Sequence, residues 1–147
     1  MLNPLPLRRH AVVVRPRFSA GKMLAAGLLA IGFACASGAA AAAEIPYSPA
    51  AYQQTLAAGK PLVVYFHATW CPTCKVQQPI VDRLSTDPKL AAVTVLEADY
   101  DKETALKKSL EITQQSTFVV FKGGHEVARS TGQTDPAALR ALFARAL

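Results

Sequence analysis

Cysteine and histidine, the usual ligands of structural zinc, are scarce in the part of this 147-residue chain that follows residue 43. A closed structural zinc site needs four cysteine or histidine ligands at suitable spacing, and the sequence has no second Cys-x-x-Cys pair. The two cysteines and two histidines in this part are Cys71, Cys74, His67 and His125. The sequence therefore argues against structural zinc, and we expect neither a metal ion nor another cofactor.

The first 43 residues contain no acidic side chain at all. A basic segment is followed by an uncharged run, residues 23–43, that ends in three alanines before Glu44. A basic start, an apolar middle and an A-x-A cleavage site are typical of a secretory signal peptide. We therefore expect residues 1–43 to direct export and residues 44–147 to form the mature domain, in the periplasm or otherwise outside the cytoplasm. Because the uncharged run is about long enough to span a bilayer, an uncleaved membrane anchor is the alternative.

The net charge of +6 comes almost entirely from this leader. Five of the sixteen lysines and arginines precede Glu44, whereas all ten acidic residues lie at or after it. The mature segment thus carries eleven basic and ten acidic side chains, a net charge near +1, and we expect no nucleic-acid partner. Cleavage would also remove Cys35, so that no third thiol remains to mispair with Cys71 and Cys74.

Residues 44–147 show no internal repeat and no linker, and their number suits one domain with one core. Helix-start signals alternate along this segment with apolar runs that are typical of buried strands. The signals are Ser48-Pro49, Pro72, Asp101 and Asp135-Pro136, and the predicted strands are 61–67, 93–98, 117–121 and 127–130. This order predicts an α/β fold, a three-layer sandwich in which helices cover both faces of a central mixed sheet.

The second predicted helix runs from Pro72 to about Ser85, and Pro79 should kink it. Its apolar spacing predicts that it packs on the sheet through Val76, Ile80, Val81 and Leu84. In sheets of this kind the working site lies at the carboxyl ends of the strands. The two cysteines fall at such a position, where the strand at 61–67 turns into this helix.

At a helix N-terminus the first sulfur of the pair faces unpaired backbone N–H groups and the positive end of the helix dipole. Both favour thiolate over thiol, so Cys71 is the candidate nucleophile and Cys74 the candidate that resolves a mixed disulfide. There are two other interpretations of the cysteine pair. It could be half of a metal site, or it could form a purely structural disulfide. The neighbouring Trp70 would offer partners a flat apolar surface.

From residue 48 to 147 the chain resembles the thioredoxin superfamily. The resemblance is carried by the run Trp70-Cys71-Pro72-Thr73-Cys74-Lys75, by Pro79, and by the run from Thr117 to Gly124. The segment 68–74 is similar to TlpA-like exported thioredoxins that reduce partners in cytochrome c maturation. This resemblance implies a thiol–disulfide oxidoreductase that acts on protein thiols and disulfides. We expect it to be a reductant supplied with electrons by a membrane-bound redox partner.

The resemblance also implies a groove in which an extended segment of the substrate lies beside the redox pair. Its expected lining is Trp70, Pro72, Thr73, Gln115, Ser116 and Thr117. The superfamily places a cis-proline where this chain has Ser116, and no proline lies between Pro88 and Pro136. Hence either the Gln115–Ser116 bond is strained and cis, or the loop is trans and reshaped. Ser116 then either presents its hydroxyl to the Cys71 sulfur or lies in a loop with no special task.

This chain departs from the superfamily at two further positions, both of which concern proton transfer. The buried acid of the superfamily maps onto Tyr65, and the lysine that neighbours it maps onto Glu97. We therefore predict that Glu97 accepts a proton from Cys74 and that Tyr65 hydrogen-bonds Glu97; an ordinary glutamate exposed at the sheet edge is the alternative. His67 either tunes the thiolate electrostatically or is a residue at the edge of the core.

Other classes of function stay open at this point. Without a shielding proline, Cys71 and Cys74 could bind a metal ion, or an iron–sulfur cluster shared between two chains. A third possibility is a domain that uses the fold for docking alone, although the presence of both cysteines argues against it.

Overall fold

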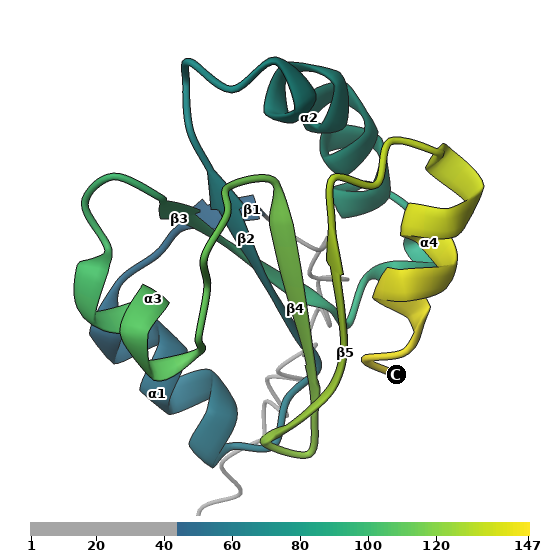
Figure 1. Ribbon diagram of the computed structural model, residues 1–147. Helices are drawn as coiled ribbons and strands as arrows, with labels where there is room; N and C mark the ends of the chain where they lie inside the picture. The colour runs from purple at the N-terminus through teal and green to yellow at the C-terminus, as the bar shows by residue number, and fades with distance from the viewer. Residues whose placement is uncertain (1–43) are drawn as a thin grey trace, which may run out of the picture. The chain divides into compact units, whose positions relative to one another are not determined.

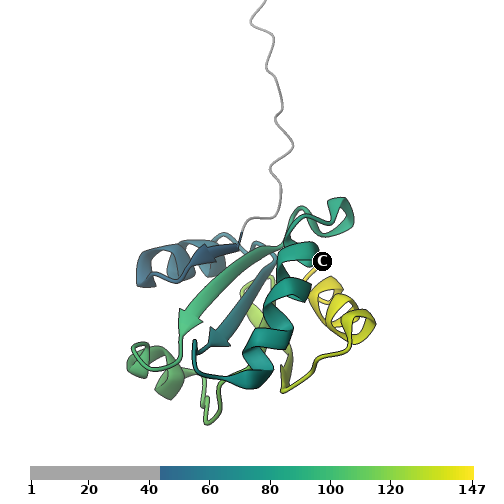
Figure 2. The same cartoon turned by 90° about the horizontal axis from the view of Figure 1, so that it is seen from above.

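The computed structural model describes residues 44–147, in which a sheet lies between two layers of helices (Figures 1 and 2). The strands are β1 (Glu44–Pro46), β2 (Leu62–His67), β3 (Thr94–Asp99), β4 (Thr117–Lys122) and β5 (His125–Thr131). The helices are α1 (Pro49–Ala57), α2 (Pro72–Ser85), α3 (Thr104–Ser109) and α4 (Pro136–Ala144), with a 3-10 turn, η1, at Pro88–Leu90. The predicted leader and Cys35 lie outside the described residues. Between residues 44 and 147, no helix is both long and apolar enough to cross a membrane.

The strands form one mixed sheet in the order β1-β3-β2-β4-β5. Strands β1, β3 and β2 run parallel, β4 is antiparallel to β2, and β5 pairs with β4 as an antiparallel hairpin. The register pairs His67 with Asp99 and Phe66 with Thr117, so the ends of β2 and β3 and the start of β4 lie at the same edge of the sheet. Helices α2 and α4 cover one face and α1 and α3 the other (Figure 1). The predicted α/β sandwich is confirmed.

Each face of the sheet has its own apolar core, because side chains alternate along the strands. Val63 and Tyr65 of β2 pack with α2 and α4, whereas Val64 and Phe66 pack with α1 and α3. Three of the four inward residues predicted for α2 are buried, but Val76 is 52 % exposed. The buried stripe of α2 passes instead through its neighbour Gln77, which lies about 100° around the helix from Val76.

The local signals placed most helix starts correctly. Ser48 and Asp135 cap α1 and α4, and each side chain accepts a hydrogen bond from a backbone N–H of its helix. The prediction that Asp101 caps a helix is wrong, since α3 begins at Thr104 after Glu103. The backbone N–H of Asp101 instead donates to the Asp99 carboxylate at 2.9 Å. Strand β1 was not predicted, because three residues are too few to show a period.

Candidate active site

Cys71 and Cys74 lie where β2 ends and α2 begins. Cys71 is the N-cap of α2, and its Sγ accepts a hydrogen bond from the backbone N–H of Cys74 at 3.1 Å. The exposed fractions of the two cysteines are 1 % and 0 %, whereas that of the preceding Trp70 is 54 %. The sulfurs therefore lie just beneath the surface, beside an exposed aromatic side chain.

The acidity of Cys71 reflects a competition between burial and hydrogen bonding. Burial acts to raise the pKa of the thiol, but its hydrogen-bond donors outweigh burial, and the net effect is a lowered pKa. The first of these donors is the Cys74 thiol, followed by the backbone N–H groups of Cys74 and Thr73 and by the side chain of Gln115. Donors have this effect because they interact more strongly with a thiolate than with a thiol. The direction agrees with the sequence prediction, although backbone dipoles are only part of the cause.

The pKa of Cys74 is shifted in the opposite direction from that of Cys71. Burial, followed by the adjacent Cys71 sulfur, raises the pKa of Cys74, while a hydrogen bond from Tyr65 acts against this rise. The Tyr65 hydroxyl also donates to the carbonyl oxygen of Cys74 at 3.4 Å. Burial, and then the neighbouring Cys74, raises the pKa of Tyr65 itself. Tyr65 is therefore a hydrogen-bond donor to Cys74 and not a base near neutral pH.

The sequence left open whether the Gln115–Ser116 peptide bond, in the loop before β4, is cis or trans. No peptide bond between residues 44 and 147 is cis, so the loop is trans and reshaped. Ser116 has a φ of +57°, in the left-handed region. Its N–H donates to the Phe66 carbonyl at 2.8 Å, and its carbonyl accepts the Gly132 N–H at 2.9 Å. The hydrogen bonds of Ser116 within the described chain are made by its backbone, and none joins its hydroxyl to Cys71.

The other residues predicted to line the groove differ in accessibility. Pro72 is exposed, whereas Thr73 and Gln115 are half-buried. Thr117 is buried, and its hydroxyl donates to the Gln114 carbonyl at 2.9 Å. The side chain of Thr117 therefore fixes the shape of the loop and offers a partner little surface.

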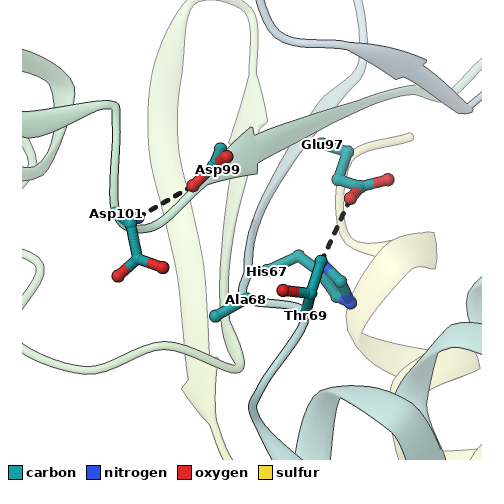
Figure 3. Close-up of a pocket in the computed structure, with 6 residues that line it drawn as sticks. All are labelled: His67, Ala68, Thr69, Glu97, Asp99 and Asp101. Atoms are coloured by element: carbon teal, nitrogen blue, oxygen red, sulfur yellow. Dashed lines mark hydrogen bonds and ion pairs between the residues drawn. The ribbon is translucent and has the colours of Figure 1, made fainter.

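A pocket of about 90 Å³ opens beside the turn that leads to Cys71 (Figure 3). Glu97 points toward His67 in this pocket, and its Oε1 lies 3.2 Å from His67 Nδ1. The predicted hydrogen bond between Tyr65 and Glu97 is not formed, because Tyr65 donates to Cys74 and Glu97 pairs with His67. The pocket is lined by His67, Ala68, Thr69, Glu97, Asp99 and Asp101. Asp101 accepts a hydrogen bond from Trp70 Nε1 at 2.8 Å, and this bond orients the indole.

Sequence reasoning missed two polar residues near the site. Gln77 is fully buried one turn after Cys74, and a polar side chain on the inward stripe of a helix was its visible signal. Glu44 accepts hydrogen bonds from Gln78 Nε2 at 3.2 and 3.0 Å. Burial, opposed by the bond from Gln78 and reinforced by the charge of Glu97, raises the pKa of Glu44 to about 7.

Among residues 44–147, no three His, Cys, Asp or Glu side chains are grouped closely enough to hold a metal ion. The arrangement instead places a thiol with a lowered pKa next to one with a raised pKa. Such a pair can form a mixed disulfide through the first sulfur and release it through the second.

Comparisons with known proteins agree with this chemistry. The family model described as thioredoxin matches residues 44–145. The chain is 36 % identical to Thioredoxin-2 of Saccharomyces cerevisiae over 98 residues, which are 66 % of this chain and 91 % of that protein. The Bifunctional thioredoxin reductase/thioredoxin of Mycobacterium leprae is 30 % identical over 88 residues, which are 60 % of this chain and only 19 % of that protein. Among solved structures, Trxlp from Edwardsiella tarda is 37 % identical with a TM-score of 0.65, and the match covers 67 % of this chain and 95 % of that one.

Proposed function

The chain belongs to the thioredoxin family, and we propose that it is an exported reductase of protein disulfides that acts through Cys71 and Cys74. Thiol–disulfide oxidoreduction is the activity that its relatives indicate. The observation that carries the assignment to these residues is the contrast between the two sulfurs. Hydrogen bonds lower the pKa of Cys71, whereas burial raises that of Cys74. This contrast supports the proposal that the first sulfur attacks and the second resolves the mixed disulfide.

The reaction begins with the Cys71 thiolate, which attacks one sulfur of the substrate disulfide. An S–S bond forms between Cys71 and that sulfur, and the other substrate sulfur leaves as a thiolate. After losing its proton, Cys74 attacks the Cys71 sulfur and releases the second substrate thiolate. Two electrons have then passed from the dithiol to the substrate, the Cys71–Cys74 disulfide has formed, and the two protons of the dithiol balance the two new substrate thiols.

The direction of net transfer depends on how strongly the reduced pair is stabilised relative to its disulfide. Burial offsets part of the stabilisation that donors give to the Cys71 thiolate. Cys74, whose pKa is raised, stays a thiol near neutral pH and adds no thiolate stabilisation to the reduced pair. A dithiol of limited stability is readily oxidised, which favours the role of reductant. Outside the cytoplasm the disulfide formed must be reduced again, and we assign this step to a membrane-bound dithiol partner.

The proton of Cys74 needs an acceptor, and Glu97 is the residue that we assign to this role. Tyr65 contacts Cys74, but burial raises the pKa of its hydroxyl. The hydroxyl therefore keeps its own proton near neutral pH and cannot accept that of Cys74. Glu97 lies opposite Tyr65 in the β2–β3 register and is 36 % exposed, so a proton on its carboxylate can exchange with solvent. In Glu97→Gln the pH dependence of disulfide reduction should change, and an unchanged profile would remove Glu97 from the mechanism.

A redox titration against glutathione tests the proposal as a whole. We expect the purified protein to form a Cys71–Cys74 disulfide with a midpoint more negative than that of glutathione, and Cys74→Ser to accumulate mixed disulfides through Cys71. Cys71→Ser is the matched control and should trap no client. If no Cys71–Cys74 disulfide forms across the accessible range, the enzyme assignment to this pair is lost. A midpoint more positive than that of glutathione would instead contradict the role of reductant.

A further inference from the structure

Gln77 connects the redox helix to two loops that are far apart in the sequence. Its Nε2 donates to the Ser116 carbonyl at 3.3 Å and to the Gln133 carbonyl at 2.8 Å. The first carbonyl belongs to the loop before β4, residues 113–116, which we call the Ser116 loop. The second belongs to residues 132–135 between β5 and α4, which we call the Gln133 loop. One buried amide on α2 therefore holds both loops.

The orientation of this amide is determined by its partners. If its oxygen and nitrogen were exchanged, the oxygen would face two carbonyl oxygens, so the amide nitrogen must point toward the loops. In this orientation Gln77 Oε1 is buried and has no hydrogen-bond partner within residues 44–147. An apolar side chain of similar size would fill the space without an unpaired acceptor. The amide is thus energetically unfavourable here except for the two hydrogen bonds that it donates.

The Ser116 loop needs such support because of its backbone. A φ of +57° is strained for a residue with a Cβ atom and is normally adopted by glycine. The Ser116 carbonyl is held from two sides, by the Gly132 N–H and by Gln77 Nε2. The side chain of Gln115, the residue before Ser116, is among the groups that lower the pKa of Cys71. The position of Ser116 therefore sets the geometry between the loop and the nucleophile.

We propose that Gln77 is a positioning residue that fixes the substrate-contacting Ser116 loop relative to Cys71. The proposal rests on the proposed function, since it assigns Gln77 to the binding of a protein disulfide by the same site. Gln77 acts through the loop and touches neither sulfur in a transfer step. Its loss should therefore weaken the binding of an extended protein substrate more than it slows the chemistry.

The test is steady-state reduction of insulin disulfides, with dithiothreitol as the electron source. Gln77→Met keeps the length of the side chain and removes both donors. We expect it to raise KM for insulin about fivefold and to leave kcat within about twofold, the effect of losing one or two buried hydrogen bonds. Gln78→Met is the matched control, because that amide donates hydrogen bonds to Glu44 and Asp82 and to neither loop.

A double-mutant cycle distinguishes positioning from general structural support. Glycine adopts a φ of +57° without strain, so Ser116→Gly should make the loop less dependent on Gln77. In that background the effect of Gln77→Met on KM should fall below about twofold. An unchanged KM in folded Gln77→Met, or the same increase in both backgrounds, overturns the inference. If the unsubstituted protein fails to reduce insulin at all, the proposed function fails instead.

If Gln77→Met does not fold, the unsubstituted protein still provides a test. Scalar couplings across hydrogen bonds should connect the Gln77 side-chain nitrogen to the carbonyl carbons of Ser116 and Gln133. The amide of Gly132, which donates to Ser116, should exchange with solvent as slowly as amides within β4. Absence of these couplings together with rapid exchange at Gly132 would contradict the inference.

Discussion

At the scale of single residues, Gln115 is the side chain from outside the Cys-x-x-Cys segment that most directly stabilises the Cys71 thiolate. Gln115→Leu preserves the approximate size and removes the donor, so the pKa of Cys71 should rise. Ultraviolet thiolate absorbance measured against pH would show the shift. The exposed neighbour Gln114 provides the control, because Gln114→Leu should leave the titration of Cys71 unchanged. Equal titrations for both variants would show that Gln115 does not act on the sulfur.

Glu44 gives the folded domain a pH dependence of its own. Burial, opposed by the hydrogen bond from Gln78 and reinforced by Glu97 and Asp82, raises the pKa of Glu44 from 4.5 to about 7. The folded protein then holds this proton more tightly than the unfolded chain does. The resulting stabilisation is full below pH 4.5 and is lost as the pH rises through about 7. After allowance for solvent contact, we expect the free energy of unfolding to fall by about 1 to 2 kcal/mol as the pH rises from 4.5 to above 7.

Urea unfolding at a series of pH values would measure this loss. The free energy of unfolding of the unsubstituted protein should fall as the pH rises from 4.5 to above 7, and Glu44→Gln should remove most of that slope. Glu103→Gln, at the start of α3 on the opposite face of the sheet, should keep the slope. A slope that survives in Glu44→Gln would assign the titration to another group.

At the scale of elements, the β4–β5 hairpin packs against the end of α1 through Gly124. Both glycines of its turn have positive φ, +59° at Gly123 and +81° at Gly124. A Cβ at Gly124 would lie 3.0 Å from the Leu56 carbonyl oxygen, whereas a Cβ at Gly123 would meet nothing within 4 Å. Alanine at Gly123 should therefore cost about 1 kcal/mol through backbone strain alone, and alanine at Gly124 about 2 to 3 kcal/mol.

Denaturant unfolding of Gly123→Ala and Gly124→Ala measures the loss of stability in each variant. Both variants carry the backbone strain, so the difference between the two losses isolates the contact with the Leu56 carbonyl oxygen. Neither variant should alter the midpoint of the Cys71–Cys74 redox titration, since the turn lies at the opposite end of β4 from Ser116. Equal losses of stability would show that the hairpin does not bear on α1 as the structure indicates.

How far each element could be predicted depended on how local its determinants are. Ser48, Cys71 and Asp135 mark helix starts through hydrogen bonds within a few residues, so the sequence alone located them and the redox pair. The trans geometry at Ser116 depends on partners in β2 and after β5, which no local pattern encodes. Likewise, the register of β2 and β3 could suggest that Glu97 lies near Tyr65, but side-chain packing decided that Glu97 pairs with His67.

At the scale of the whole molecule, the first described strand begins where the predicted leader ends. Strand β1 starts at Glu44 and pairs in parallel with β3 from that residue onward. Cleavage after Ala43 would remove no residue of the five described strands, and it would keep the Glu44 side chain that bonds Gln78.

We accordingly predict that the protein recovered from outside the cytoplasm begins at Glu44, which intact mass or N-terminal sequencing would show. The peptidase requires small side chains at the first and third positions before the cut, so replacing Ala41 and Ala43 together by leucine should block processing. The blocked variant should stay attached to the membrane through its uncharged run and keep an active redox pair, because the substitutions lie outside the described domain. An unsubstituted protein that is exported but keeps residues 1–43 would establish the anchor, and one retained in the cytoplasm would remove the need for a membrane-bound electron donor.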